Sequence, residues 1–269
     1  MGGSLLTGIP YTPEEGALVL AGASVLLIVV LLISVWKKMG IGREFVVGLL
    51  MGGAQLFGIA VLLTFLFRFD DDVRIWFPPV IVLIGLMAVI GGRRSAKRAS
   101  GMPGAVRITT PAIIAGAAVS LTVLALSRAM PLKPQFIVPL AGMAFGNSMT
   151  ICSLALDRLV REFEMNRAAI ETRLSLGASS KQAMEDLSRR CVRAALIPTI
   201  DRLKTLGIIF IPGAMAGLLI AGTDPLVAAE YQLIVYLMIV GGGIVTSLIV
   251  AVLSRSRFFN ENEQVRDWI

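Results

Sequence analysis

The sequence predicts an all-α, polytopic membrane protein with seven transmembrane helices, in a single transmembrane domain that covers residues 1–269. Three observations carry this prediction. Hydrophobic residues make up 56% of the chain and charged residues only 16%, whereas ordinary globular domains carry roughly a quarter charged residues. The mean hydropathy is +0.81. The apolar residues also occur in runs of about 20, the length of helix that crosses a bilayer core about 30 Å thick.

Seven such runs follow one another along the chain. A charged residue stands within three residues of the end of each run. The sixth run has an interfacial lead-in that begins at Leu196. The expected spans are Ala17–Trp36, Phe45–Phe67, Ile75–Gly91, Ile108–Ser127, Phe136–Leu156, Leu206–Ala221 and Leu226–Leu253.

The distribution of lysine and arginine predicts the orientation of these spans. Of the 25 basic residues, 21 fall in one alternate set of loops and four in the other. Basic loops are retained on the cytoplasmic side. The sequence therefore predicts an external N-terminus, a cytoplasmic C-terminus and an odd number of spans in the plasma membrane. The four basic residues on the external side are Arg68, Arg74, Arg128 and Lys133.

The composition excludes several classes of function. Histidine is absent, which removes histidine-based catalytic triads and the HExxH zinc site. No GxxxxGK[ST] phosphate loop occurs, so the chain is not expected to hydrolyse nucleotide or to bind a cofactor itself. The two cysteines, Cys152 and Cys191, are far apart and favour packing over a disulfide. The net charge is +7, and most of the basic residues fall in predicted cytoplasmic loops beside the spans. Basic residues in this position set the orientation of the spans and contact anionic lipid headgroups. They do not favour nucleic-acid binding.

One long soluble segment, Asp157–Ala195, lies between the fifth and sixth spans on the predicted cytoplasmic side. Helix-forming residues run to Leu176, Gly177 suits a helix C-cap, and Ser179 or Ser180 suits the N-cap of a second helix. Glu171 stands six residues before Gly177, a spacing that resembles the cytoplasmic "EAA" coupling loop of bacterial ABC permeases. A solvated charged loop with two ordinary helices is the competing interpretation. The candidate coupling residues are Glu171, Arg173, Leu176, Gly177, Ala178 and Ser179.

The C-terminal half also carries a set of motifs at close spacing. These motifs are Pro139–Met149, Leu174–Ser179, Arg193–Asp201, Lys204–Gly207, Pro212–Gly217, Ala221–Pro225 and Tyr231–Gln232. Together they resemble the FetB-type permease family of bacterial iron-export ABC permeases and plant aluminium-tolerance relatives. The resemblance implies a membrane subunit that pairs with a separate ATP-binding subunit, as two permeases with two ATPases. It leaves the cargo and the direction of transport open.

Polar groups inside a membrane are costly and are therefore candidate pathway residues. Gln55 and Asn147 lie in the middle of the second and fifth spans, although hydrogen bonding between helices would explain them equally well. Asp201 and Lys204 share a helical face at the entrance of the sixth span. Met143 and Met149 are candidate soft ligands, with apolar packing as the alternative. No metal site follows from these residues.

Two other functions remain open at this point. A secondary transporter would carry a coupling carboxylate deep in a span and an inverted repeat, and neither is evident in the sequence. A membrane scaffold protein would need neither the mid-span amides nor a compact coupling segment. The compact coupling segment and the mid-span amides favour an ABC permease subunit, and the family resemblance implies an exporter of iron or another metal-related cargo.

Overall fold

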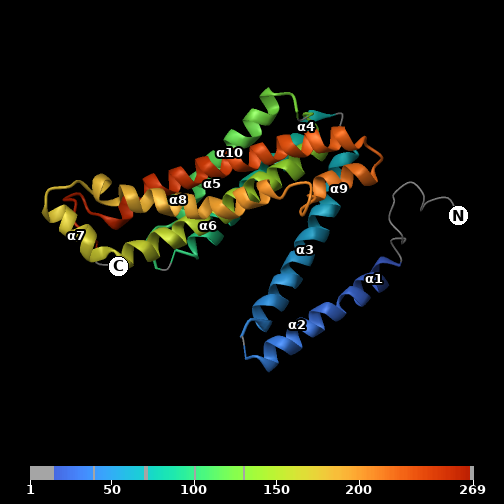
Figure 1. Cartoon of the computed structure of the whole chain (residues 1–269). Coiled ribbons are helices and arrows are strands. Elements are labelled where there is room, and N and C mark those ends of the chain that lie inside the picture. Colours follow the sequence, from blue (N-terminus) through green and yellow to red (C-terminus); the bar gives the residue numbers. More distant parts are fainter. Residues whose placement is uncertain (1–14, 39, 70–71, 100, 130, 267–269) are drawn as a thin grey trace.

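The computed structural model describes residues 15–38, 40–69, 72–99, 101–129 and 131–266, and this part of the chain folds into ten α-helices (Figure 1). The predicted external N-terminus, residues 1–14, lies outside the described residues. The helices are α1 (Gly16–Ala23), α2 (Val25–Trp36), α3 (Gly42–Phe67), α4 (Val73–Ala96), α5 (Val106–Leu126), α6 (Pro134–Met165), α7 (Arg167–Ser175), α8 (Ser180–Lys204), α9 (Gly213–Ile220) and α10 (Pro225–Phe258).

Six helical stretches in the described residues are long and apolar enough to cross a membrane. They are Leu18–Trp36, which joins α1 and α2, together with α3, α4, α5, α6 and α10. The all-α polytopic fold is therefore confirmed. The six stretches match six of the seven expected spans, and the difference lies in the sixth expected span, Leu206–Ala221.

That sixth span is not one continuous helix. Helix α8 ends at Lys204, residues 205–212 are non-helical, and α9 has only eight residues. Gly207 adopts a φ of +89°, and Pro212, which cannot donate a backbone hydrogen bond, precedes α9. Eight helical residues measure about 12 Å, well short of the hydrocarbon core. The apolar run is correctly located, but glycine and proline break its helix.

The directions of the neighbouring helices require the chain to return through this broken segment. Asn147 bonds to Ile239, and the ring of Phe163 stacks on that of Phe258, so α6 and α10 run parallel. Helix α8 packs against both of them. Helices α6 and α10 are parallel, so the chain must return from the end of α6 to the start of α10, along the length of the bundle. It returns through α8, the break and α9.

Helices α4, α5, α6 and α10 form the packed core of the described chain. Helices α5 and α10 approach most closely through glycine, because a Cβ atom on Gly242 would lie 2.7 Å from the carbonyl oxygen of Gly116. The Ser120 hydroxyl donates to the Met238 carbonyl across the same contact, at 3.0 Å. Small residues thus let two backbones approach in an environment where packing, not the hydrophobic effect, associates helices.

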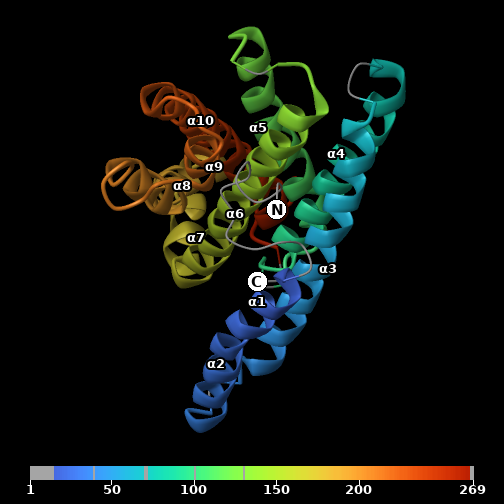
Figure 2. The same cartoon turned by 90° about the vertical axis from the view of Figure 1, so that its right-hand side faces the viewer.

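Helix α2 and the start of α3 extend away from this core, whereas the end of α3 lies beside α4 (Figure 2). A small cluster of Leu66, Trp76, Val80 and Val138 ties the end of α3 to α4 and α6. Most of the remaining α3 surface is exposed and apolar, including Leu50, Leu56 and Phe57. In a membrane protein such a surface faces lipid or another subunit.

Candidate functional site

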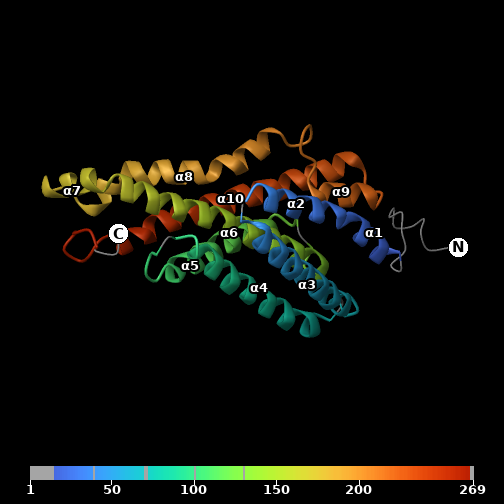
Figure 3. The same ribbon diagram turned by 90° about the horizontal axis from the view of Figure 1, so that it is seen from below.

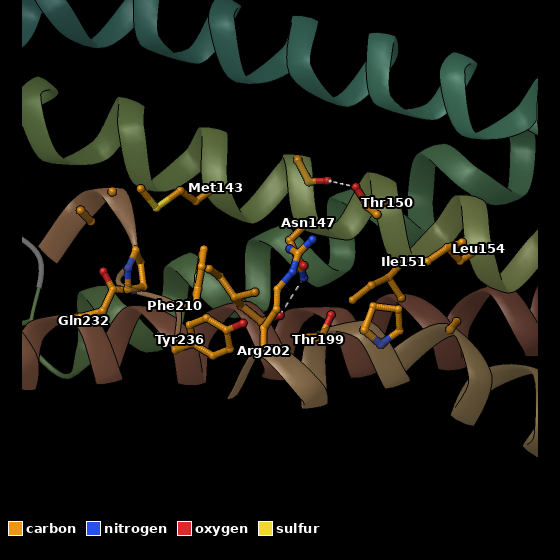
Figure 4. Close-up of a pocket in the computed structure, with 17 residues that line it drawn as sticks. Met143, Asn147, Thr150, Ile151, Leu154, Thr199, Arg202, Phe210, Gln232 and Tyr236 are labelled. Atoms are coloured by element: carbon orange, nitrogen blue, oxygen red, sulfur yellow. Dashed lines mark hydrogen bonds between the residues drawn. The ribbon is translucent and has the colours of Figure 1, made fainter. Parts of the chain in front are cut away.

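A cavity of about 450 Å³ lies where α8 ends and the chain breaks before α9 (Figure 4). Its walls come from α6, α8, the break, α9 and α10. Asn147 and Ile239, which line it, stand near the centres of the expected spans Phe136–Leu156 and Leu226–Leu253. In the predicted placement the cavity is therefore at mid-membrane depth. Its polar side chains are Asn147, Thr150, Thr199, Arg202, Gln232 and Tyr236.

Two amides of the cavity are held by the backbone around it. The Asn147 side chain donates through Nδ2 to the carbonyl of Ile239 at 2.9 Å. The buried Gln232 accepts through Oε1 from the backbone N–H of Met215 at 3.1 Å, in the first turn of α9. Gln232 therefore satisfies one of the donors that a helix start leaves without a partner. The short helix α9 is fixed to α10 by this contact.

Arg202 carries the one charge among the residues that line this cavity. Its side chain extends from α8 toward Asn147 (Figure 4). The predicted candidates beside it, Asp201 and Lys204, do not line the cavity; they pair with each other at 3.4 Å on the exposed side of α8. One residue along a helix is a rotation of about 100°, which separates Arg202 from that pair.

The structure brings together two of the six predicted pathway residues, Met143 and Asn147. Met149 lies on another face of α6, where its carbonyl accepts from the Ser95 hydroxyl at 3.0 Å. Gln55 is exposed on α3 and does not reach the cavity. Sequence reasoning did not select Arg202, Gln232 and Tyr236 as pathway residues; the packing of α8 against α10 brings them to the same cavity.

The cavity offers few groups to a bare metal ion. Among the described residues, no cluster of three or more aspartate, glutamate or cysteine side chains could hold one. Borderline metals are held by imidazole, thiolate or carboxylate ligands, and none of these lines the cavity. Its possible ligands are the amide oxygens of Asn147 and Gln232, the Met143 sulfur and hydroxyl groups.

A second candidate site lies at the other end of α8, where α7, a tight turn and α8 form a helix-turn-helix. Gly177 has a φ of +90°, and its N–H and that of Ala178 donate to Leu174 and Arg173 at 2.9 and 3.0 Å. These bonds close the C-terminus of α7. Ser179 caps α8 in a reciprocal capping box with Gln182. The predicted glycine turn is therefore confirmed, and Ser179, not Ser180, is the N-cap.

The remaining coupling candidates either brace this turn or face outward. Arg173 donates to the Ala183 carbonyl at 3.2 Å, which fixes α7 to α8. Glu171 pairs with Arg167 at 2.9 Å within α7. The Leu176 side chain is 83% exposed at the tip of the turn. One feature differs from the sequence prediction: α6 extends to Met165 and the chain bends there before α7 begins.

The C-terminal segment supports the coupling turn, and sequence reasoning missed this contact. Phe258 and Phe259 pack on Phe163 of α6, with ring centroids 4.3 and 5.6 Å apart. The Glu263 carboxylate accepts from the backbone N–H of Ser180, in the first turn of α8. Hydrogen bonds from Ser180 hold the pKa of this carboxyl below its ordinary value. Figure 3 shows α7 and the C-terminal segment at the same end of the bundle.

Cys191 lies on α8 between the coupling turn and the cavity. It is buried and free, as is Cys152. Burial, with a smaller contribution from the Glu162 carboxylate, raises the pKa of the Cys191 thiol to about 11. The thiol is therefore neutral at physiological pH and acts as a packing group.

Comparison with known proteins places the chain in a family. Residues 17–259 match the family described as "Uncharacterised protein family (UPF0014)". The chain is 32% identical to "UPF0014 membrane protein STAR2" of Oryza sativa subsp. japonica, over 87% of this chain and 81% of that protein. It is 32% identical to "Probable iron export permease protein FetB" of Escherichia coli, over 91% and 93%.

A further relative is "Protein ALUMINUM SENSITIVE 3" of Arabidopsis thaliana, 29% identical over 91% of this chain and 88% of that protein. No solved structure matches the chain. The six apolar helical stretches and these membrane-protein relatives make the chain a multi-pass plasma-membrane protein. It belongs to the UPF0014 membrane protein family.

Proposed function

We propose that the chain is the non-catalytic permease subunit of an ABC transporter that exports iron or another metal-related cargo. ATP is bound and hydrolysed by a separate subunit that docks on the α7–α8 turn. The observation that carries this proposal is the helix-turn-helix itself. Its second helix is capped by Ser179, and Glu263 of the C-terminal segment accepts a hydrogen bond from Ser180. Leu176 is exposed at the turn. The iron-export name of the Escherichia coli relative supports the choice of cargo.

Helix α8 links the docking surface to the cavity. It is helical from Ser180, beside the turn, to Lys204, beside the break, and it contains Pro198 near its cavity end. Its 25 residues span about 37 Å. A displacement of the α7–α8 turn by an ATPase would therefore be carried along the helix to the cavity wall, and Pro198, which lacks a backbone donor, is where the helix can bend beside Thr199 and Arg202.

The cavity is the proposed cargo pathway. The break between α8 and α9 exposes backbone polar groups within the predicted span, and such irregular backbone is tolerated in membranes where it is covered by protein or lines a cavity. Here Gln232 holds the start of α9 while Phe210 and Pro212 border the open space. Movement of α8 relative to α10 would change the access to this space.

The proposed assembly contains two permeases. The exposed apolar surface of α2 and α3, with Leu50, Leu56 and Phe57, supports a contact with a second copy within the membrane. The two rival functions, a secondary transporter and a scaffold, share the fold but need no ATPase. They are separated from the proposal by experiment.

The test is co-purification of the chain with the ATP-binding subunit, followed by transport measurements in vesicles. The expected result is iron movement that requires ATP and fails when the ATPase carries an inactivating phosphate-loop substitution. Transport driven by an ion gradient in the absence of the ATPase would identify a secondary transporter. A stable complex with no transport of any cargo would favour the scaffold.

A further inference from the structure

Arg202 is the starting point because it places a permanent positive charge beside a cavity at the predicted mid-membrane depth. The count of basic residues assigns Arg202 to the cytoplasmic loop before the sixth span, and the residue is exposed, so the cavity is open to ligands on this side. Guanidinium groups do not deprotonate in proteins. A charged group within a membrane is costly and is normally paired, and an intramembrane arginine marks a functional site by default. The question is therefore which anion accompanies Arg202.

The part of the chain that the structure describes supplies no such anion. No carboxylate lines the cavity. The nearest acidic residue in sequence, Asp201, is on the exposed face of α8 and pairs with Lys204 at 3.4 Å. Other acidic residues of the cytoplasmic helices pair near the coupling turn, as Glu171 does with Arg167. Within the described residues, no acidic side chain balances the charge of Arg202 in the cavity.

The other groups around Arg202 favour an anion as well. The hydroxyls of Thr199 and Tyr236 line the same space and can donate hydrogen bonds. The start of α9 borders it through Gly213 and Ala214, and the first N–H groups of a helix attract negative charge. A guanidinium, hydroxyl donors and a helix start together form the kind of environment that binds carboxylate or phosphate oxygens.

We propose that this cavity is an anion-binding site in which Arg202 recognises a carboxylate-bearing cargo. This inference rests on the proposed permease function and specifies its cargo. A metal that follows this pathway leaves as a negatively charged chelate with oxygen donors, and a bare cation is repelled by Arg202. The volume of about 450 Å³ lies in the range of small-molecule sites. The free organic anion and its metal chelate share this chemistry.

The experiment measures binding to the purified permease in lipid nanodiscs, without the ATPase. The three probes are citrate, ferric citrate and ferrous ion alone under anaerobic conditions. Citrate, ferric citrate or both are expected to bind, and ferrous ion alone is not. Citrate and ferric citrate as separate arms show whether the site takes the free anion or the chelate.

Three variants at two neighbouring residues make the test specific. Arg202→Gln removes the cavity charge and is expected to weaken anion binding at least tenfold, whereas Arg202→Lys retains part of it. The matched control is Lys204→Gln, which removes a positive charge two residues away on the exposed face and is expected to leave binding within twofold. Thermal stability of each variant in nanodiscs checks the fold.

Three outcomes would overturn the proposal. They are the absence of citrate and ferric citrate binding to the intact chain, ferrous ion binding that Arg202→Gln leaves unchanged, and an equal loss of anion binding in Arg202→Gln and Lys204→Gln. Because no ATPase is present, these outcomes are distinct from a failure of the ABC function. That function would fail through the absence of ATP-dependent transport, whatever the cavity binds.

Discussion

The two ends of α8 satisfy their polar groups in opposite ways. At the end that is predicted to be cytoplasmic, Ser179 and Gln182 cap each other, Glu263 accepts from Ser180, and Arg173 donates to Ala183. At the cavity end, the chain breaks after Lys204 and Arg202 faces a space without a carboxylate. The first end is completed by contacts within the described chain, whereas the second leaves a cavity. This difference agrees with the proposal that α8 connects a fixed docking surface to a cargo pathway that changes shape.

The largest expected effect tests whether α8, the break and α9 together cross the membrane. A single cysteine introduced at Leu176 should react with a membrane-impermeant maleimide only from the cytoplasmic side. One introduced at Ala221, beyond α9, should react only from the external side. Background labelling is expected to be low because Cys152 and Cys191 are buried. Labelling of both positions from the same side would show that α8, the break and α9 do not cross the membrane.

The next effect tests the rigid end of α8 through Gly177. Its φ of +90° disfavours any side chain, although a Cβ atom there would meet no neighbour. Gly177→Val therefore imposes a conformational penalty of about 1 to 3 kcal/mol and no steric clash. If this penalty falls on docking, ATPase co-purification drops roughly 5- to 150-fold while the permease remains inserted.

The matched control for Gly177→Val is Gly58→Val on α3, where the added side chain also meets no neighbour and no positive φ is involved. It should retain the ATPase. The reversal Glu171→Arg, which places two like charges beside each other with Arg167, is expected to weaken docking in the same direction. Full association in both Gly177→Val and Glu171→Arg would remove the coupling assignment.

A smaller effect tests the open end through the two mid-span amides. Asn147→Leu removes a hydrogen bond within the membrane that is typically worth about 0.6 kcal/mol and at most about 2, so the fold should persist. Cargo-stimulated ATPase activity should fall, because Asn147 lines the cavity. Gln55→Leu makes the same chemical change on the exposed surface of α3 and should leave that activity unchanged. Equal behaviour of the two variants would place the pathway elsewhere.

These amides also show how far sequence reasoning reaches. Hydropathy located the membrane spans, and local rules identified Gly177 and Ser179, because a helix cap depends on a few adjacent residues. Asn147 and Gln55 look alike in sequence, since both stand in the middle of an apolar run. Only the packing of α6 against α8 and α10 distinguishes the residue that lines a cavity from the one that faces outward.

The broken span shows that apolar composition predicts the location of a span but not whether its backbone is helical. Leu206–Ala221 is apolar enough for a span, but apolar composition does not fix helical geometry, and Gly207 and Pro212 interrupt it. Arg202 could have been identified from its position in the sequence. It stands between Asp201 and Lys204, which share one face of the helix. Arg202 must therefore lie on a different face. The contact of Glu263 with Ser180 could not have been identified in this way, because it joins residues 83 positions apart.

A pH effect at the rigid end is expected through Glu263. The pKa of this carboxyl is lowered from the ordinary value of 4.5 by Ser180, so the contact is complete above that value and is lost as the pH falls through the lowered pKa. The protection of the first α8 amides against hydrogen exchange, corrected for the intrinsic exchange rate at each pH, should therefore be independent of pH near neutrality and should decrease only in acid. In Glu263→Gln the acid-induced loss of protection should disappear. A loss of protection between pH 6 and 7 in the unmodified protein would contradict this assignment.

The smallest expected effect on docking and transport concerns Cys191, which lies on α8 between the two ends. Its thiol pKa of about 11 exceeds the ordinary value of 9.0 because burial disfavours the thiolate. Since folding keeps the thiol protonated, its contribution to stability is complete below pH 9 and is lost as the pH rises toward 11. Alkylation of Cys191 by iodoacetamide at pH 8 should be slower than that of an exposed cysteine at Leu176 by two orders of magnitude or more, because both burial and the small thiolate fraction reduce it. Cys191→Ala should leave docking and transport unchanged. Rapid alkylation of Cys191 at pH 8 would contradict this assignment. It would show that α8 separates from α6 and is less firmly held than its capped end implies.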